Sequence, residues 1–141
     1  MAIESSAPHP GREDVSGWRL RLDEDMIAAH EASGAWAGKT LWQWAAEYAE
    51  AEPERLLIVD GAREFKVGEV VAQARRLAAG LHRLGLRRGD VLSYQLPNWA
   101  EVVVLNLAAS LAGLVSNPIV PIYRESEVRH ILRDSGSRLF L

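Results

Sequence analysis

The stretch GDVLSYQLPNWAEVVVLNLAASLAGLVSNPIVPIYRESEVRHILRDSGSRLFL, residues 89–141, decides the fold because short apolar runs alternate in it with segments of helical spacing. The predicted elements are a buried strand over 91–96, a helix over 99–112, a strand over 114–120, a helix over 125–135 and the start of a strand at 138–141. This alternation is typical of right-handed crossover units. The predicted fold class is α/β, with an incomplete, mostly parallel sheet and helices on both faces.

Turn and cap residues set the boundaries of these elements. Asn98 is predicted to cap the helix over 99–112, since Glu101 follows three residues later, and Gly113 is predicted to end that helix. Pro118 and Pro121 place the following strand at an irregular or edge position, because proline cannot donate to a sheet ladder.

The upstream half predicts two helices and a hairpin. Thr40 and Gln43 form a capping box at the start of a helix, and the dipeptide Asp60-Gly61 indicates a hairpin turn between strands at 56–59 and around Phe65. An amphipathic helix follows, and Gly85 is its predicted stop. Its apolar face is predicted to comprise Val67, Val70, Val71, Ala74, Leu77, Ala78, Leu81 and Leu84.

The chain is predicted to have three parts. Residues 1–17, rich in Ser, Pro, Gly and charge, are expected to be a flexible leader. Residues 18–39 are expected to be partly helical, with Met26 and Ile27 on one side together with His30. Residues 40–141 are expected to form a truncated N-terminal α/β subdomain.

Composition excludes several classes of function. The 141 residues are 48% hydrophobic and carry a net charge of -3, which gives no general attraction to nucleic acid. The chain has no cysteine and no apolar run near the ~20 residues that span a bilayer, and its first residues, which lack a basic patch followed by an apolar run, are not expected to be a signal peptide. We therefore expect a cytoplasmic protein without a nucleic-acid partner or a transmembrane segment.

Motifs that carry chemistry are absent from the sequence. It contains no G-x-x-x-x-G-K-[ST] loop, no G-x-G-x-x-G turn, no H-E-x-x-H helix and no G-x-S-x-G elbow. The histidines at 9, 30, 82 and 130 are too scattered to predict a metal site. No catalytic residue is predicted.

Two surface features have a structural interpretation. The basic stretch over 75–90 is interpreted as a solvated helix face and turn. The tryptophans are interpreted as packing residues rather than a recognition surface; they are Trp36, Trp42, Trp44 and Trp99.

One polar pair, Tyr123-Arg124, lies between a predicted strand and a predicted helix. Ligands of open α/β sheets gather at the carboxyl ends of strands, and an arginine there can bind a phosphate through two hydrogen bonds. The alternative for Arg124 is a solvated side chain at a helix start.

Three blocks together resemble one known family: ASGAWAGKTLWQW (32–44), FKVGEVVAQARRLAAGLHRLGLRRGD (65–90) and QLPNWAEVVVLNLAASLAGLVSNPIVPIYRESEV (95–128). Their ordered set is similar to the AMP-forming acyl-CoA synthetases of the adenylate-forming superfamily, over roughly residues 35–141. The segment NPIVPIYRESEV most resembles the branch acting on alicyclic and medium-chain acids, such as cyclohexanecarboxylate–CoA ligase.

The resemblance implies the first part of the large N-terminal domain of such an enzyme. The full-length family uses ATP, Mg²⁺ and CoA to convert a carboxylic acid into an acyl-adenylate and then a CoA thioester. The family's phosphate loop, adenine and ribose contacts and catalytic lysine lie downstream of the matched region. The chain alone is therefore expected to be inactive, to hold no cofactor, and to need the missing downstream part of the domain. Arg124, where many relatives have threonine, is carried over as a contact to a CoA phosphate.

Two alternatives stay open at this point. The chain could be a non-catalytic α/β interaction module that pairs with a partner chain supplying further strands; such a module should be monodisperse and melt cooperatively. A complete small nucleotide-binding protein is the third reading, which the absence of a phosphate loop disfavours.

Overall fold

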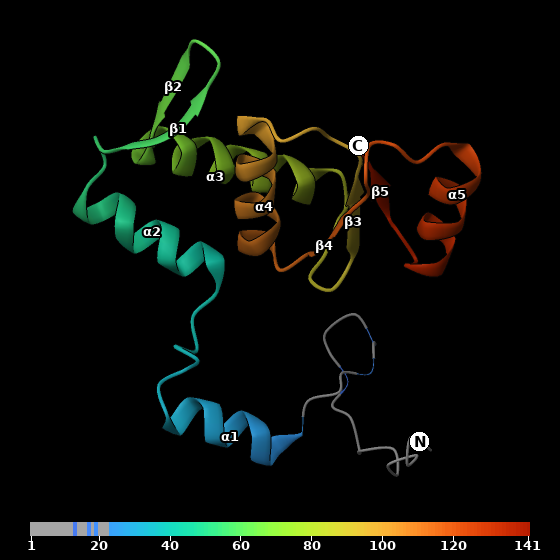
Figure 1. The fold of residues 1–141 in the computed structure, drawn as a ribbon, viewed down its shortest axis with the longest axis horizontal. Coiled ribbons are helices and arrows are strands. Elements are labelled where there is room, and N and C mark those ends of the chain that lie inside the picture. The colour runs from blue at the N-terminus through green and yellow to red at the C-terminus, as the bar shows by residue number, and fades with distance from the viewer. Residues whose placement is uncertain (1–12, 14–16, 18, 20–22) are drawn as a thin grey trace, which may run out of the picture. The chain divides into compact units, whose positions relative to one another are not determined.

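The computed structural model describes residues 13, 17, 19 and 23–141 (Figure 1). The chain divides into two compact units, Met1–Lys39 and Thr40–Leu141, and each is described by itself below. The predicted leader over 1–17 falls almost entirely outside the described residues, as does the start of the segment predicted over 18–39.

The first unit contains one helix, α1 (Glu24–Ala32), within its described residues. The side chain of Asp23 caps this helix by accepting a hydrogen bond from the Met26 N–H at 2.7 Å. The rings of His30 and Trp36 stack with their centroids 4.8 Å apart. The helix expected in this segment is therefore present, although none of its residues is buried.

The second unit begins with the predicted capping box. Thr40 Oγ1 accepts from the Gln43 N–H at 3.2 Å, and Gln43 Oε1 accepts from the Thr40 N–H at 2.7 Å, which starts α2 (Leu41–Ala51). Strands β1 (Leu56–Asp60) and β2 (Arg63–Lys66) then pair antiparallel. Gly61 has a φ of 62° in their turn, so the predicted hairpin is confirmed.

Helix α3 (Val67–Arg83) follows β2 directly and presents a buried apolar face. Six predicted positions are buried, namely Val67, Val70, Val71, Ala74, Ala78 and Leu81. Leu84 was wrongly predicted to share that face, because the helix ends at Arg83 and the side chain of Leu84 is 71% exposed. Gly85, with a φ of 90°, turns the chain away at the predicted stop.

The parallel sheet contains β3 (Val91–Tyr94), β4 (Val115–Pro118) and β5 (Leu139–Phe140) in the order β4-β3-β5. All four residues of the central strand β3 are buried. β4 lies at the sheet edge, as its prolines predicted. The strands are shorter than predicted, because the ladder between β3 and β4 ends where Tyr94 is paired with Pro118.

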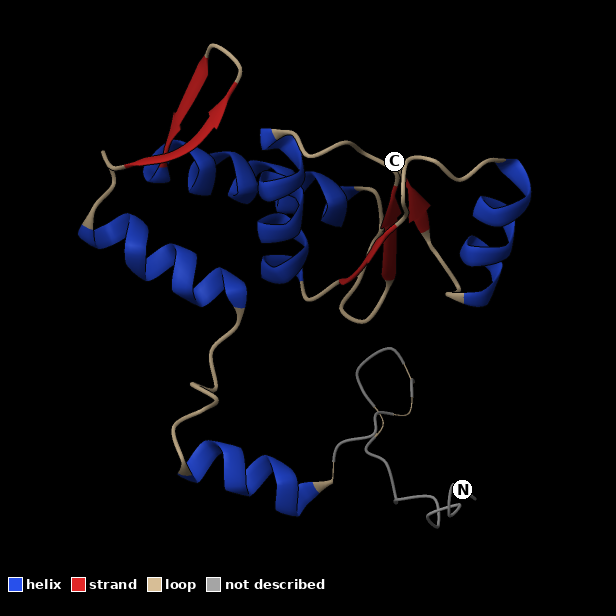
Figure 2. Cartoon of the chain, in the orientation of Figure 1, coloured by secondary structure: helices blue, strands red, loops and turns tan. Residues whose placement is uncertain are grey.

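Helices α4 (Ala100–Ala112) and α5 (Glu125–Asp134) lie on opposite sides of this sheet (Figures 1 and 2). The strand order explains this placement. The connection through α4 runs from β3 to one neighbour, whereas the connection through α5 returns past β3 to the other edge. Two right-handed crossovers in opposite directions must use opposite faces, so the predicted α/β class with helices on both faces is confirmed.

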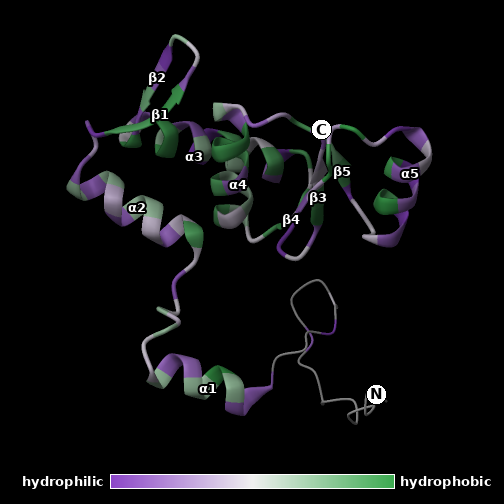
Figure 3. Cartoon of the chain, viewed as in Figure 1, coloured by the Kyte–Doolittle hydropathy of each residue, from purple (hydrophilic) through white to green (hydrophobic). Residues whose placement is uncertain are grey.

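The core lies where α3 and α4 pack on β3, and these elements carry much of the apolar colouring in Figure 3. Its innermost residues, fully shielded from solvent, are Val70, Ala74, Leu92, Ala108 and Ala109. Small residues on the two helices allow close approach, since alanine places little volume between the helix axes. Gly113, at a φ of 69°, ends α4 as predicted.

The start of α4 differs from the prediction. Trp99, not Asn98, occupies the N-cap position, and it makes no side-chain capping bond. The Ala100 N–H instead donates to Asp60 Oδ2 of the hairpin at 3.2 Å. One of the free amides at the helix start, that of the buried residue Ala100, is thus satisfied by a residue distant in sequence instead of by a local cap.

Candidate phosphate-binding cleft

Arg124 lies where β4 has ended and α5 begins, as the sequence predicted. It is the N-cap residue of α5, and its N–H donates to Glu127 Oε2 at 3.2 Å. The pKa of the Glu127 carboxyl lies below its usual range, because it accepts hydrogen bonds from its own N–H, from the Ser126 hydroxyl and from the Arg124 N–H. Glu127 is therefore an anion that orders the first turn of the helix.

The side chain of Arg124 is exposed and bends over its own loop. Its Nη1 donates to the carbonyl oxygens of Pro121 at 3.2 Å and Tyr123 at 3.4 Å. These bonds use one of the guanidinium nitrogens. The remaining N–H groups of the guanidinium leave donors for a ligand, since arginine carries five.

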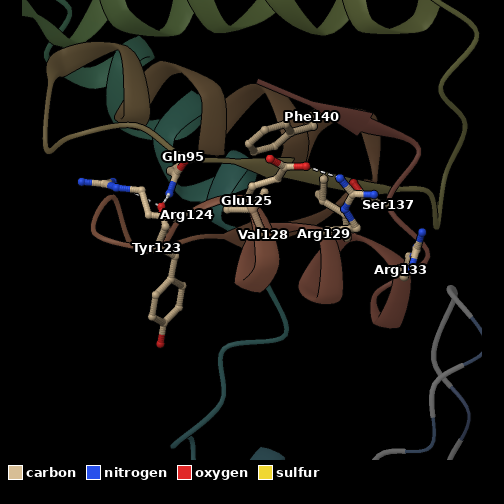
Figure 4. A pocket seen from close by; sticks show the side chains of 10 residues that line it. Gln95, Tyr123, Arg124, Glu125, Val128, Arg129, Arg133, Ser137 and Phe140 are labelled. Atoms are coloured by element: carbon tan, nitrogen blue, oxygen red, sulfur yellow. Dashed lines mark hydrogen bonds and ion pairs between the residues drawn. The ribbon is translucent and has the colours of Figure 1, made fainter.

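A cleft of about 780 Å³ runs along α5 beside this loop (Figure 4). Arg124 and Arg133 lie toward its two ends, and Phe140 of β5 lies between them. The remaining lining residues are Gln95, Tyr123, Glu125, Val128, Arg129, Leu132 and Ser137. The cleft therefore combines an apolar floor with cationic ends.

Positive charge prevails among the cleft's side chains. The cleft lining includes three arginines, Arg124, Arg129 and Arg133, and one carboxylate, Glu125, which forms an ion pair with Arg129 one helical turn away. The other two arginines bring positive charge that this carboxylate does not offset. Guanidinium groups bind phosphate oxygens through paired, charge-assisted hydrogen bonds, so a phosphorylated ligand fits this arrangement.

Sequence reasoning found the pair Tyr123 and Arg124 but missed the other cleft residues. Arg129 and Arg133 are four residues apart and so lie on one face of α5, which is a signal the sequence did contain. Gln95 and Phe140 had no comparable signal. They reach the cleft only because β3 and β5 are neighbours in the sheet.

The other candidate residues lie elsewhere. Arg75, Arg76 and Arg83 of the basic stretch are exposed, as interpreted, and the Arg75 guanidinium lies 5.0 Å from the ring centroid of Trp42. The expectation that the tryptophans pack inside holds for Trp42, which contacts the core. It fails for Trp44 and Trp99, which are each 51% exposed, and for Trp36, which is 39% exposed.

The described residues offer neither a metal site nor a membrane-spanning helix. Among residues 13, 17, 19 and 23–141, no group of three or more His, Cys, Asp or Glu side chains is placed to bind a metal ion. The same residues include no helix with the length and apolar character required to traverse a lipid bilayer.

Comparison with known proteins gives the family. The model of the family described as AMP-binding enzyme matches residues 42–141. The chain is 29% identical to the medium-chain fatty-acid–CoA ligase of Escherichia coli (strain K12), over 98% of this chain and 25% of the relative. It is 33% identical to the salicyl-AMP ligase / salicyl-S-ArCP synthetase of Mycobacterium tuberculosis, over 91% of this chain and 24% of that protein.

A solved structure supports the same assignment. The apo structure of Mycobacterium smegmatis MbtA superposes with a TM-score of 0.79 at 29% identity, over 84% of this chain and 23% of that chain. The chain thus spans about a quarter of the length of these relatives. The chain has a parallel sheet with helices on both faces, and the family model matches residues 42–141. The chain therefore belongs to the AMP-binding enzyme family of adenylate-forming ligases.

Proposed function

We propose that this chain is the front part of an ATP-dependent, AMP-forming carboxylic acid–CoA ligase, and that Arg124 helps to hold a phosphate of CoA. The observation that carries the second part is the position of Arg124. It lies beyond the carboxyl end of a parallel strand, in a cleft with two further arginines, on a chain of the AMP-binding enzyme family.

The reaction of the full-length enzyme would have two steps. A carboxylate oxygen of the acid attacks the α-phosphorus of ATP, and pyrophosphate leaves as the acyl-adenylate forms. The thiolate sulfur of CoA then attacks the acyl carbon, AMP leaves with the electrons of the broken C–O bond, and a thioester results. Both steps build up negative charge, which positioned cations stabilise.

This chain would supply the scaffold and the CoA side of that reaction. We assign ATP and Mg²⁺ to the part of the enzyme outside these 141 residues, because the sequence contains no glycine-rich phosphate loop. Resemblance to the alicyclic and medium-chain branch favours such an acid as the substrate, and we place the reaction in the cytoplasm. The fit to CoA rests on the guanidinium groups of the cleft.

The cleft consists entirely of residues of this chain. For CoA the proposal therefore replaces the expectation that the isolated chain holds no cofactor, and the phosphate contact is testable on this chain. CoA should be titrated into the ¹⁵N-labelled chain, with Arg124→Ala and, as a control for the lost charge, Arg83→Ala on α3. Arg124→Ala should raise the Kd at least about tenfold, the effect of losing a charge-assisted hydrogen bond. Equal weakening by both variants, or no binding to the wild type, contradicts the role of Arg124.

The scaffold role has its own test. Purified chain should show no exchange of labelled pyrophosphate into ATP in the presence of medium-chain, alicyclic or aryl acids. Exchange well above a heat-denatured control would show that these 141 residues activate a carboxylate and would overturn this part of the proposal.

A further inference from the structure

The residue after β3 and the exit loop of β4 lie at the same edge of the sheet, because the two strands are parallel and paired. The chain leaves β3 toward α4 on one face of the sheet and leaves β4 toward α5 on the other face. Gln95 follows β3 at this point, and residues 119–124 follow β4.

The side chain of Gln95 connects β3 to the exit loop of β4. Its Nε2 donates to the carbonyl oxygens of Val120 and Tyr123, both at 3.0 Å. Its backbone N–H donates to the Leu141 carbonyl at 2.8 Å, on the side of β5. One half-buried residue thus fixes the exit loop of β4 to the central strand, while its own backbone is held by the opposite neighbour.

The loop that Gln95 holds has little packing of its own. Val120 is 53% exposed and Ile122 is 72% exposed, so apolar burial does little to set their positions. Within the loop, the Tyr123 N–H donates to the Val120 carbonyl at 3.1 Å. The two carbonyls that Gln95 binds therefore belong to the first and last residues of this turn. The side-chain amide of Gln95 joins these two residues by hydrogen bonds to both.

Arg124 depends on the same carbonyls. Its Nη1 shares the Tyr123 carbonyl with Gln95 and also binds the Pro121 carbonyl. Figure 4 shows Gln95 next to Arg124 at one end of the cleft. A shift of the turn would carry these acceptors, and with them the guanidinium, away from their present place.

We propose that Gln95 is a positioning residue that holds the 120–124 loop so that Arg124 presents its guanidinium to an anionic ligand, by the proposed function a phosphate of CoA. This inference rests on the proposed function for the identity of the ligand. The geometry of the loop does not depend on that identity. The two parts can therefore fail separately.

The first measurement needs no ligand. Gln95→Met keeps the length of the side chain and removes both N–H donors, whereas Gln73→Met makes the same change on α3, away from the cleft. Amide hydrogen exchange at Tyr123 should be at least about fivefold faster in Gln95→Met, since each lost hydrogen bond contributes about 1 kcal/mol. Unchanged exchange relative to wild type and Gln73→Met overturns the inference.

The second measurement is a double-mutant cycle on CoA binding. Gln95→Met should raise the Kd for CoA several-fold in the wild-type background and leave it unchanged in the Arg124→Ala background, because Gln95 acts through Arg124. Gln95→Asn, whose amide is one methylene shorter and cannot span both carbonyls, should behave likewise if Gln95→Met fails to fold. Additive effects would overturn the positioning role.

The outcomes separate the two claims. Faster exchange with normal CoA binding removes Gln95 from ligand binding and leaves the role of Arg124 intact. If the wild-type chain binds no CoA, the proposed function of the cleft fails and the binding role of Gln95 fails with it, while the exchange result still decides whether Gln95 holds the loop.

Discussion

The carboxylate of Asp60, the last residue of β1, accepts a hydrogen bond from the N–H of Ala100 at the start of α4, at 3.2 Å. Asp60 also accepts from Arg63 at 2.6 Å, and Arg63 in turn donates to Glu101 of α4 at 2.8 Å. A hairpin that forms its own two-stranded sheet is thereby attached to the helix that covers the parallel sheet. A negative charge at this point also complements the positive end of the α4 dipole.

Removal of the Asp60 carboxylate should therefore loosen the hairpin from α4. Asp60→Ala is expected to lower the melting temperature and to speed amide exchange at Ala100, since that N–H loses its acceptor. Glu64→Ala, an exposed acid on the same hairpin, is the matched control. Equal melting temperatures for the two variants would show that this cap contributes nothing to stability.

The same cluster should make stability depend on pH. The Ala100 N–H and then Arg63 lower the pKa of Asp60, and Arg63 lowers the pKa of Glu101. Because the unfolded carboxyls bind protons at higher pH than the folded ones, the stabilisation is present above about pH 4 and lost as pH falls through the lowered values.

Arg63→Gln should flatten this dependence without abolishing it, because the bond from Ala100 to Asp60 remains and Glu127 also titrates with a lowered pKa. Urea unfolding measured from about pH 3 to 7 tests the slope. A wild type whose unfolding free energy rises on acidification across that range would have the opposite sign and would contradict the assignment.

Core packing around β3 should dominate stability. Leu92 is fully buried at the centre of the sheet, so Leu92→Ala is expected to cost about 2–5 kcal/mol of unfolding free energy. Leu84→Ala is the same substitution at a residue that is 71% exposed, and it should change stability by less than about 0.5 kcal/mol. Denaturant unfolding compares them, and similar losses would place the core elsewhere.

Alanine substitutions at two glycines with positive φ distinguish the stability cost of backbone strain from the cost of steric crowding. Gly85→Ala meets open space at a φ of 90°, so it should cost about 1 kcal/mol from the backbone alone. Gly113→Ala places its Cβ 3.0 Å from the Arg88 Cγ at a φ of 69°, and it should cost more than Gly85→Ala. The reverse order in urea unfolding would show that Arg88 moves aside freely.

Local signals in the sequence predicted the elements well, and long-range contacts account for what they missed. The Thr40–Gln43 box and the Gly113 stop act within a few residues, so their pattern is visible in the chain itself. Asn98 was a reasonable cap by the same logic, but Asp60 replaces it through a contact between distant residues. No pattern near Asn98 could have indicated that.

The cleft shows the same division. Arg124 could be predicted because its place depends on chain order alone, after a strand and before a helix. Gln95 could not, because its partners Val120 and Tyr123 lie on the neighbouring strand's exit loop and come within reach only once β3 and β4 pair in register. Residues that connect neighbouring strands can be predicted only when the order of the strands in the sheet is known.

The central claim, that these 141 residues are the front of an acid–CoA ligase, is tested most directly by sequencing the coding DNA beyond the codon for Leu141. We predict an open frame that runs into a Ser/Thr/Gly-rich loop ending in lysine. A stop codon immediately after Leu141 would contradict it and would favour a non-catalytic module that pairs with another chain.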